Sequence, residues 1–444
     1  MSPEFFVLGS RAMRAWTLSI AISSSLFGCF GDPDPNPDPP NPPSQNDPAF
    51  SIAGLRSWYL IGDAARPGND RMTFIVTAPS GADYVDAYIP TIGAKRMQHQ
   101  SDGYALDLSI AGLAPGDYDI LFSANNSNEA FAKATFHRSA AYYVLVSTDY
   151  DFSDPGAVSL TRMDALHTNH PGVVITHFWA PYTYTDPAVT DARRDELDTW
   201  IKKQRDVNHD EIGLHIHPYC NFVDTAGIAC ITDQSTVYAT DTSGYTIKLA
   251  AYGRTQMGML LQRAKDIFAT RGLGEPKTFR AGGWTADENV LLALDDNGFV
   301  ADTSALNWAK IEEWNGKELY TWNMEHWSSI TDTSQPYYPS TTDPQTSVAG
   351  SNMAMLEVPD NGVMIDYVSL AEMTGIFDAN WTGNALLAPT TLMMGFHPAD
   401  GFTSSEYLRV DEFLKYADMH LATKDLGPVV YISLSDVTPV FPAQ

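Results

Sequence analysis

The run YYVLVSTDYD, at residues 142–151, contains the pattern that decides the fold. Its first seven residues, Tyr142 to Thr148, form a largely apolar stretch of the kind found in strands buried on both faces. Asp149 and Asp151 end the run. Side chains two apart in an extended chain point to the same face. We therefore predict a buried strand followed by two carboxylates that face the same way.

Strands and helices alternate along the chain after this first strand. We predict further strands at residues 173–178, 212–216, 278–281, 299–301, 392–396 and 429–434, and helices at 191–204, 253–269, 288–296 and 404–420. Repeated alternation favours a parallel sheet with its chemistry at the carboxyl ends of the strands. The predicted fold class is α/β, a partial or distorted (β/α) barrel over residues 139–444.

The segment before the predicted barrel has a different sequence pattern, with short strand-like runs and no predicted helices. Short runs at residues 71–76, 84–89, 104–110 and 118–122 alternate apolar and polar residues and are separated by turns rich in Gly, Pro and Ser. Residues 51–138 are therefore predicted to form a small all-β, immunoglobulin-like sandwich. No catalytic-looking cluster of His, Asp or Glu occurs there, so a spacer or a carbohydrate-binding accessory role is expected.

The first fifty residues have the features of an export signal. Arg11 and Arg14 precede the apolar stretch 15–27, which suits a signal peptide and is too short to span a bilayer. Leu26-Phe27-Gly28-Cys29 looks like a bacterial lipobox, so we predict a signal peptide at 1–28 and a lipid anchor on Cys29. An ordinary secretory signal is the alternative. A Pro/Asp-rich tether at 29–50 follows, and the expected location is the bacterial cell envelope, as a membrane-anchored lipoprotein.

The composition excludes one large class of partner. The chain of 444 residues has 27 Lys and Arg against 54 Asp and Glu, a formal charge of −27. Nucleic-acid binding needs clustered positive charge, and the sequence has none. No protein partner is predicted either.

Two cysteines remain in the exported part of the chain, Cys220 and Cys230. Thiols tend to pair in an oxidising compartment, so we predict a disulfide between them. Structural zinc ligation is the alternative, although no second cysteine pair lies nearby.

Polar residues of ligand type follow several predicted strands. His215 and His217 are two apart in the run EIGLHIHP at 211–218, as Asp149 and Asp151 are in theirs. Two imidazoles and a carboxylate suit one divalent metal ion, with zinc expected and cobalt or nickel as alternatives. Arg280 ends another apolar strand, where it can orient a carboxylate, and His397 ends the strand at 392–396.

This order of motifs resembles the polysaccharide deacetylase superfamily, also called carbohydrate esterase family 4 or the NodB-homology domain, over residues 142–438. The resemblance implies that Asp149 is the catalytic base and Asp151 the metal carboxylate. It also implies that His215 and His217 bind the metal. Arg280 would be the partner of the base, and His397 the general acid.

The sequence departs from the family pattern in two places, which mark a divergent branch. Tyr150 separates the two aspartates, which are usually adjacent, so the roles of Asp149 and Asp151 could be exchanged. The two histidines are usually four apart, and here Tyr219 occupies the fourth place.

The resemblance implies a metal-dependent hydrolase that removes acetyl groups from an N-acetylated or O-acetylated polysaccharide or a peptidoglycan-like glycan. Trp179, Trp284 and Trp308 lie near predicted strand ends and are candidate platforms for sugar rings, with core packing as the alternative. Two other functions stay open: a non-catalytic glycan-binding surface lipoprotein, and a glycoside hydrolase, which would need two carboxylates flanking its substrate.

Overall fold

A curled parallel sheet forms the centre of the larger part of the molecule, in a computed structural model that describes residues 38–63, 65–398 and 402–443. Its strands run in the order β15-β14-β13-β12-β11-β10-β16, and β17 also pairs with β10. They are β10 (Tyr142–Asp149), β11 (Ile175–Trp179), β12 (Glu211–Ile216), β13 (Thr278–Ala281), β14 (Ala301–Asp302), β15 (Leu356–Glu357), β16 (Thr390–Phe396) and β17 (Val429–Tyr431). Among the described residues these strands all pair in parallel, which confirms an α/β fold of distorted-barrel type.

Strand β10 holds the sheet together. All eight of its residues are buried, and it pairs with β11, β16 and β17. This position explains its sequence, because a strand covered on both faces has no solvent side that needs polar residues.

Irregular chain continues the sheet between β15 and β16. The Gly362 backbone N–H donates to the Met393 carbonyl, and the Ile365 N–H donates to the Gly395 carbonyl. On the other side, the Asp360 N–H donates to the Ala305 carbonyl. Residues 360–365 therefore connect β16 to the chain that follows β14.

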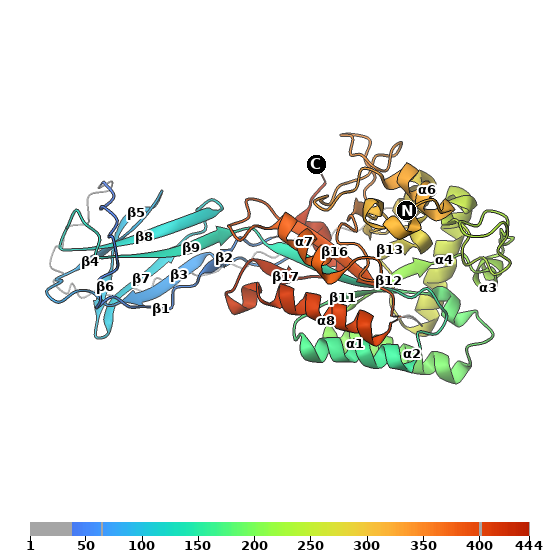
Figure 1. The fold of residues 1–444 in the computed structure, drawn as a ribbon, viewed down its shortest axis with the longest axis horizontal. Coiled ribbons are helices and arrows are strands. Elements are labelled where there is room, and N and C mark those ends of the chain that lie inside the picture. Colours follow the sequence, from blue (N-terminus) through green and yellow to red (C-terminus); the bar gives the residue numbers. More distant parts are fainter. Residues whose placement is uncertain (1–37, 64, 399–401, 444) are drawn as a thin grey trace, which may run out of the picture.

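Helices lie around the outside of this sheet (Figure 1). They are α1 (Ala157–Asn169), α2 (Asp191–Lys203), α3 (Cys220–Val223), α4 (Gly253–Arg271), α5 (Glu288–Asp296), α6 (Glu318–Trp327), α7 (Leu370–Asn380), α8 (Ser404–Asp418) and α9 (Leu434–Val437). Helix α4 ends at Gly272 in the left-handed conformation, as its sequence predicts. None of the helices in the described ranges is long and apolar enough to cross a membrane.

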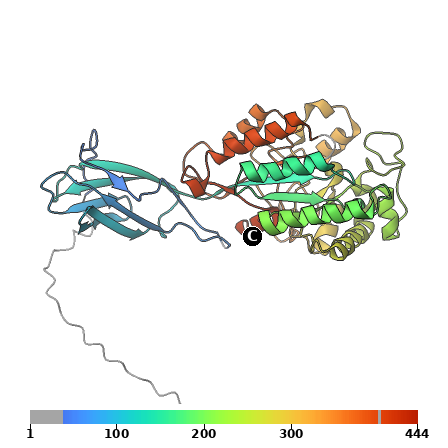
Figure 2. The ribbon, with the colours of Figure 1, turned by 90° about the horizontal axis from the view of Figure 1, so that it is seen from below.

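The preceding residues form an all-β unit at one end of the molecule (Figures 1 and 2). One sheet has the order β1-β3-β7-β6 and the other β2-β9-β8-β4-β5, and a separate apolar core lies within the unit. The strands are β1 (Ile52–Ala53), β2 (Trp58–Leu60), β3 (Arg71–Val76), β4 (Val85–Ile89), β5 (Gly93–Arg96), β6 (Gln98–Gln100), β7 (Gly103–Ser109), β8 (Gly116–Ala124) and β9 (Ala132–Ser139). The immunoglobulin-like assignment stays a prediction.

Candidate metal centre and active site

The register of the parallel sheet brings the predicted site residues to one edge. Thr148 of β10 pairs with Phe396 of β16, so Asp149 and His397 each follow a member of that pair. His215 of β12 pairs directly with Arg280 of β13. The carboxyl ends of parallel strands meet at the same edge, and side chains that are far apart in sequence therefore converge there.

Asp151, His215 and His217 form the centre of this edge. Asp151 Oδ1 lies 3.2 Å from His215 Nε2 and 3.4 Å from His217 Nε2. The three candidate ligand atoms all lie within 4.8 Å of one another. The aspartate side chain is 14% exposed and the His215 side chain 1%, so the group is largely shielded from solvent.

Backbone contacts fix the tautomer of both histidines. His215 Nδ1 lies 2.9 Å from the Arg280 carbonyl oxygen, and His217 Nδ1 lies 2.8 Å from the Tyr245 carbonyl oxygen. A carbonyl oxygen only accepts, so each Nδ1 carries the proton and donates it. In the neutral rings both Nε2 atoms therefore present a lone pair to the Asp151 carboxylate.

This arrangement fits a bound divalent cation. Two lone pairs and a carboxylate oxygen repel one another unless a positive charge lies between them, and His217 Nε2 is buried without a hydrogen-bond partner. Ligand atoms about 2.05 Å from a tetrahedral ion lie about 3.3 Å apart, close to the spacing of Asp151 Oδ1 from the two imidazoles. Histidines whose Nδ1–H donates to a carbonyl are the usual form of metal-binding imidazole.

A glycine permits the close packing of His217. A Cβ atom at Gly282 would lie 2.6 Å from His217 Cγ and 2.7 Å from the Ile216 carbonyl oxygen. Both distances are shorter than van der Waals contact, so the chain that follows β13 approaches the histidine this closely only with glycine at position 282.

Asp149 is held by the guanidinium of Arg280. Arg280 Nη1 donates to Asp149 Oδ1 at 2.9 Å and to Ser147 Oγ at 2.9 Å. Its Nη2 lies 3.0 Å from Asp360 Oδ2. Burial alone would lower the pKa of Arg280, but the carboxylates of Asp149 and Asp360 outweigh burial and raise it. Arg280 therefore stays charged and fixes the orientation of Asp149.

His397 faces the centre from the neighbouring strand. Its Nδ1 lies 2.7 Å from Asp366 Oδ2, and its Nε2 lies 3.7 Å from Asp151 Oδ1. Burial opposes the charged imidazolium, but the nearby Asp151 and Asp366 carboxylates raise the pKa of His397 to about 10. A pKa this high keeps the imidazole of His397 protonated at neutral pH.

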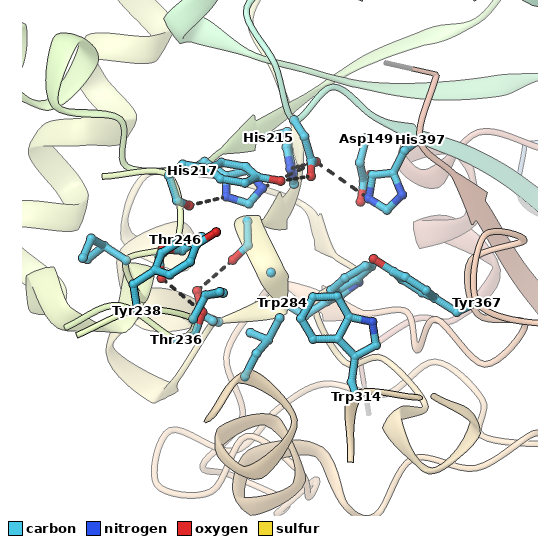
Figure 3. A pocket seen from close by; sticks show the side chains of 18 residues that line it. Asp149, His215, His217, Thr236, Tyr238, Thr246, Trp284, Trp314, Tyr367 and His397 are labelled. Atoms are coloured by element: carbon cyan, nitrogen blue, oxygen red, sulfur yellow. Dashed lines mark hydrogen bonds and ion pairs between the residues drawn. The ribbon is translucent and has the colours of Figure 1, made fainter. Parts of the chain in front are cut away.

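A cavity of about 220 Å³ opens onto these groups. In Figure 3 the three histidines lie together at one side of it, Trp284, Trp314 and Tyr367 line the opposite wall, and Tyr238 lies at the rim. Tyr238 is 63% exposed. The described residues that line the cavity include no Lys or Arg.

Sequence reasoning missed several of these residues. Asp366 follows the apolar residues 363–365, which is the same signal that identified Asp149, so the pattern could have found it. Tyr245 lies in a turn and Trp314 ends the three-residue 3₁₀ helix Glu312–Trp314. Neither segment is long enough for a periodicity that would place its side chains relative to the sheet.

Two of the three predicted tryptophan platforms are wrong for this structure. Trp179 is buried, packs on Tyr150 and donates its indole N–H to the Tyr184 hydroxyl. Trp308 is also buried and packs edge-on against Trp284. Neither presents a face to the cavity, because both occupy the apolar core. Trp284 does line the cavity.

The predicted disulfide is present between Cys220 and Cys230, with a Cα–Cα distance of 5.1 Å. It ties the chain that follows His217 to the start of the long loop before α4. The predicted lipid-anchor residue Cys29 lies outside the described residues.

Several solved structures that are similar to this chain are described as polysaccharide deacetylases or family 4 carbohydrate esterases. A family 4 carbohydrate esterase from Streptomyces lividans, solved with acetate, has 12% identity over 66% of this chain and 92% of its own, with a TM-score of 0.32. The chain is similar to polysaccharide deacetylases. A probable polysaccharide deacetylase from Pseudomonas aeruginosa has 13% identity over 68% and 93%, with a TM-score of 0.39.

A third similar structure is the Xyl-CE4 domain of a multidomain xylanase from the hindgut metagenome of Trinervitermes trinervoides. It has 8% identity over 66% of this chain and 88% of its own, with a TM-score of 0.33. No family model and no curated protein matches the sequence. Identities of 8–13% and TM-scores below 0.5 carry no information about the activity of this chain.

Proposed function

We propose that this protein is a metal-dependent deacetylase that removes acetyl groups from an N-acetylated or O-acetylated polysaccharide. The observation that carries the proposal is the pair of bare imidazole nitrogens, His215 Nε2 and His217 Nε2, turned toward one oxygen of Asp151. Asp149 and His397 flank this centre as a carboxylate and a protonated imidazole. A general base and a general acid placed in this way accelerate the hydrolysis of an amide or ester.

Asp151, His215 and His217 are the residues that would hold the ion. A divalent ion there would supply a Lewis acid for the acetyl carbonyl and lower the pKa of a water molecule toward neutrality. Zinc suits a ligand set of two nitrogens and one oxygen, with cobalt or nickel as alternatives.

Side chains of this protein carry out the two proton transfers of the proposed reaction. Asp149, oriented by Arg280, takes a proton from water as the water oxygen bonds to the acetyl carbon. His397 gives the Nε2 proton to the leaving nitrogen or oxygen as the carbon–nitrogen or carbon–oxygen bond breaks. The products are acetate and a free amine or hydroxyl. Asp366 holds Nδ1 of His397, so that the proton transferred is the one that faces the cavity.

The cavity supports a neutral glycan as substrate. Its walls combine aromatic and aliphatic side chains with the carboxylates of Asp149 and Asp151, and the described lining residues include no Lys or Arg, which disfavours phosphorylated or uronic acid substrates. Tyr238 at the rim and Phe152 beside Tyr245 are 63% and 40% exposed. Exposed rings suit the faces of pyranose units that continue beyond the acetylated one.

The parts of the chain outside the barrel complete the proposal. We propose that residues 1–28 are a signal peptide, that Cys29 is acylated, and that residues 29–50 tether the protein to an envelope membrane. Residues 51–138 would then hold the catalytic unit, residues 139–444, away from that membrane. A metabolic label on lipid attached to Cys29, lost in Cys29→Ser, tests this part separately.

Acetate release tests the activity directly. Acetylated chito-oligosaccharide, acetylated xylan and peptidoglycan are each incubated with the zinc-loaded protein and with protein treated with a chelator. Asp149→Asn and His397→Gln are expected to lose about 10²–10⁴-fold in rate, while the exposed Asp206→Asn should match the parent. Release of reducing sugar without acetate would instead establish a glycoside hydrolase, and glycan binding without product would establish a binding protein.

A further inference from the structure

Tyr245 touches two of the three candidate metal ligands, although it lies 28 residues from the nearer one. It belongs to the loop between α3 and α4, which begins at the Cys220–Cys230 disulfide. The Asp241 carboxylate organises this loop by accepting from the Ser243 and Thr246 backbone N–H groups and from both hydroxyls. The position of Tyr245 is therefore fixed from within its own loop.

The first contact of Tyr245 involves its backbone. Its carbonyl oxygen accepts the Nδ1 proton of His217 at 2.8 Å. This contact orients the ring so that Nε2 faces Asp151, and it does not depend on the identity of the side chain at position 245.

The second contact involves the side chain. The Tyr245 hydroxyl donates to Asp151 Oδ2 at 2.8 Å. The other oxygen, Oδ1, is the one that faces His215, His217 and His397. The two carboxylate oxygens therefore have different partners: Oδ1 faces the histidines, and Oδ2 accepts the hydrogen bond from the Tyr245 hydroxyl. Without that hydrogen bond, Oδ2 would be free to turn toward an ion as well.

We propose that Tyr245 is a positioning residue that restricts Asp151 to binding the metal through Oδ1 alone. The proposal rests on the metal centre of the proposed function but not on the acetyl substrate. A carboxylate that binds with one oxygen leaves one more position at the ion for water and for the substrate carbonyl, and catalytic sites need such open positions.

A neighbouring tyrosine offers a matched control. Tyr219 stacks on Tyr245, with ring centroids 5.4 Å apart and planes 25° apart. Its hydroxyl donates to the backbone carbonyl oxygen of Asp151 at 3.3 Å, and not to the carboxylate. Tyr219→Phe and Tyr245→Phe therefore remove the same group from the same stack, and only the second frees a carboxylate oxygen.

The test compares metal binding by these two variants and the parent. Zinc affinity is measured by competition with a chromogenic chelator, and the coordination of a substituted cobalt(II) ion is followed by its visible absorption. Tyr245→Phe is expected to bind zinc about 10–100-fold more weakly, as is typical when a hydrogen bond behind a metal ligand is lost. Its cobalt bands should also weaken, because a two-oxygen carboxylate raises the coordination number. Tyr219→Phe should match the parent in both measurements.

An unchanged cobalt spectrum in Tyr245→Phe would overturn the proposal, even if zinc affinity fell, because a fall alone is what a merely structural role predicts. Failure of the proposed function has a different signature. A parent protein that binds cobalt and releases no acetate from any glycan contradicts the deacetylase activity. The cobalt spectrum of Tyr245→Phe then still decides whether Tyr245 restricts Asp151. A parent that binds no divalent ion overturns both.

Discussion

Arg280 is the buried cation on which the arrangement behind the metal centre depends. In Arg280→Met the side chain keeps its apolar stem but loses the guanidinium, which contacts Asp149, Asp360 and Ser147 at 2.9–3.0 Å. All four residues are buried. Breaking a buried ion pair by removing one partner costs about 3–5 kcal/mol, because it leaves charge without compensation. A folded unit of about 300 residues has an unfolding entropy of about 0.6 kcal/mol/K, so such a loss lowers the melting temperature by roughly 5–8 °C.

Thermal unfolding followed by circular dichroism, with a chelator present to remove metal effects, measures this cost. Arg254→Met is the matched control, because Arg254 makes two hydrogen bonds to Asp296 but about half of each side chain is exposed. It should melt close to the parent. Adding Asp149→Asn to Arg280→Met should restore part of the lost stability. Equal melting temperatures for the two arginine variants would refute the claim that Arg280 neutralises buried carboxylates.

Three further variants test one buried carboxylate of the sheet, Asp302 of β14, and two residues of the site. Burial raises the pKa of Asp302 from 3.8 to about 6, so its ionisation costs stability as pH rises through that window. The melting temperature of Asp302→Asn relative to the parent should therefore climb between these pH values and then level, and a constant difference would contradict this. Asp366→Asn should lower kcat at least about tenfold with KM unchanged, because His397 loses its orienting partner; a change in KM alone would exclude that role. Tyr238→Ala should raise KM about 2–12-fold for acetylated oligosaccharides, from about 0.5–1.5 kcal/mol of ring contact, and leave a small aryl acetate unaffected. Equal effects on both substrates would remove Tyr238 from glycan binding.

The sequence predicts the sheet and the residues at its carboxyl edge because both follow from local pattern. An apolar run that ends in a polar residue identified Asp149, His215, Arg280 and His397, and the parallel register then brings them together. The two-residue strand β15 was missed, because a run so short has no detectable period.

The rest of the site depends on contacts that no local pattern encodes. Tyr245 reaches Asp151 from a loop whose path is set by a disulfide and by Asp241. Trp179 and Trp308 have the same chemistry as Trp284, yet they pack in the core while Trp284 lines the cavity. Which aromatic residue faces a cavity is decided by long-range packing, so position near a strand end could not separate them.

The central claim is that Asp151, His215 and His217 bind a divalent ion, and metal content tests it most directly. The purified protein is loaded with zinc, dialysed and analysed by elemental mass spectrometry beside a His215→Ala, His217→Ala double variant. His167→Ala, which removes a histidine paired with Asp210 away from the site, serves as control. The account predicts close to one ion per chain in the parent and in the control, and a loss of that ion in the double variant. A parent that retains no zinc, cobalt or nickel, or a double variant that retains as much as the parent, would contradict it.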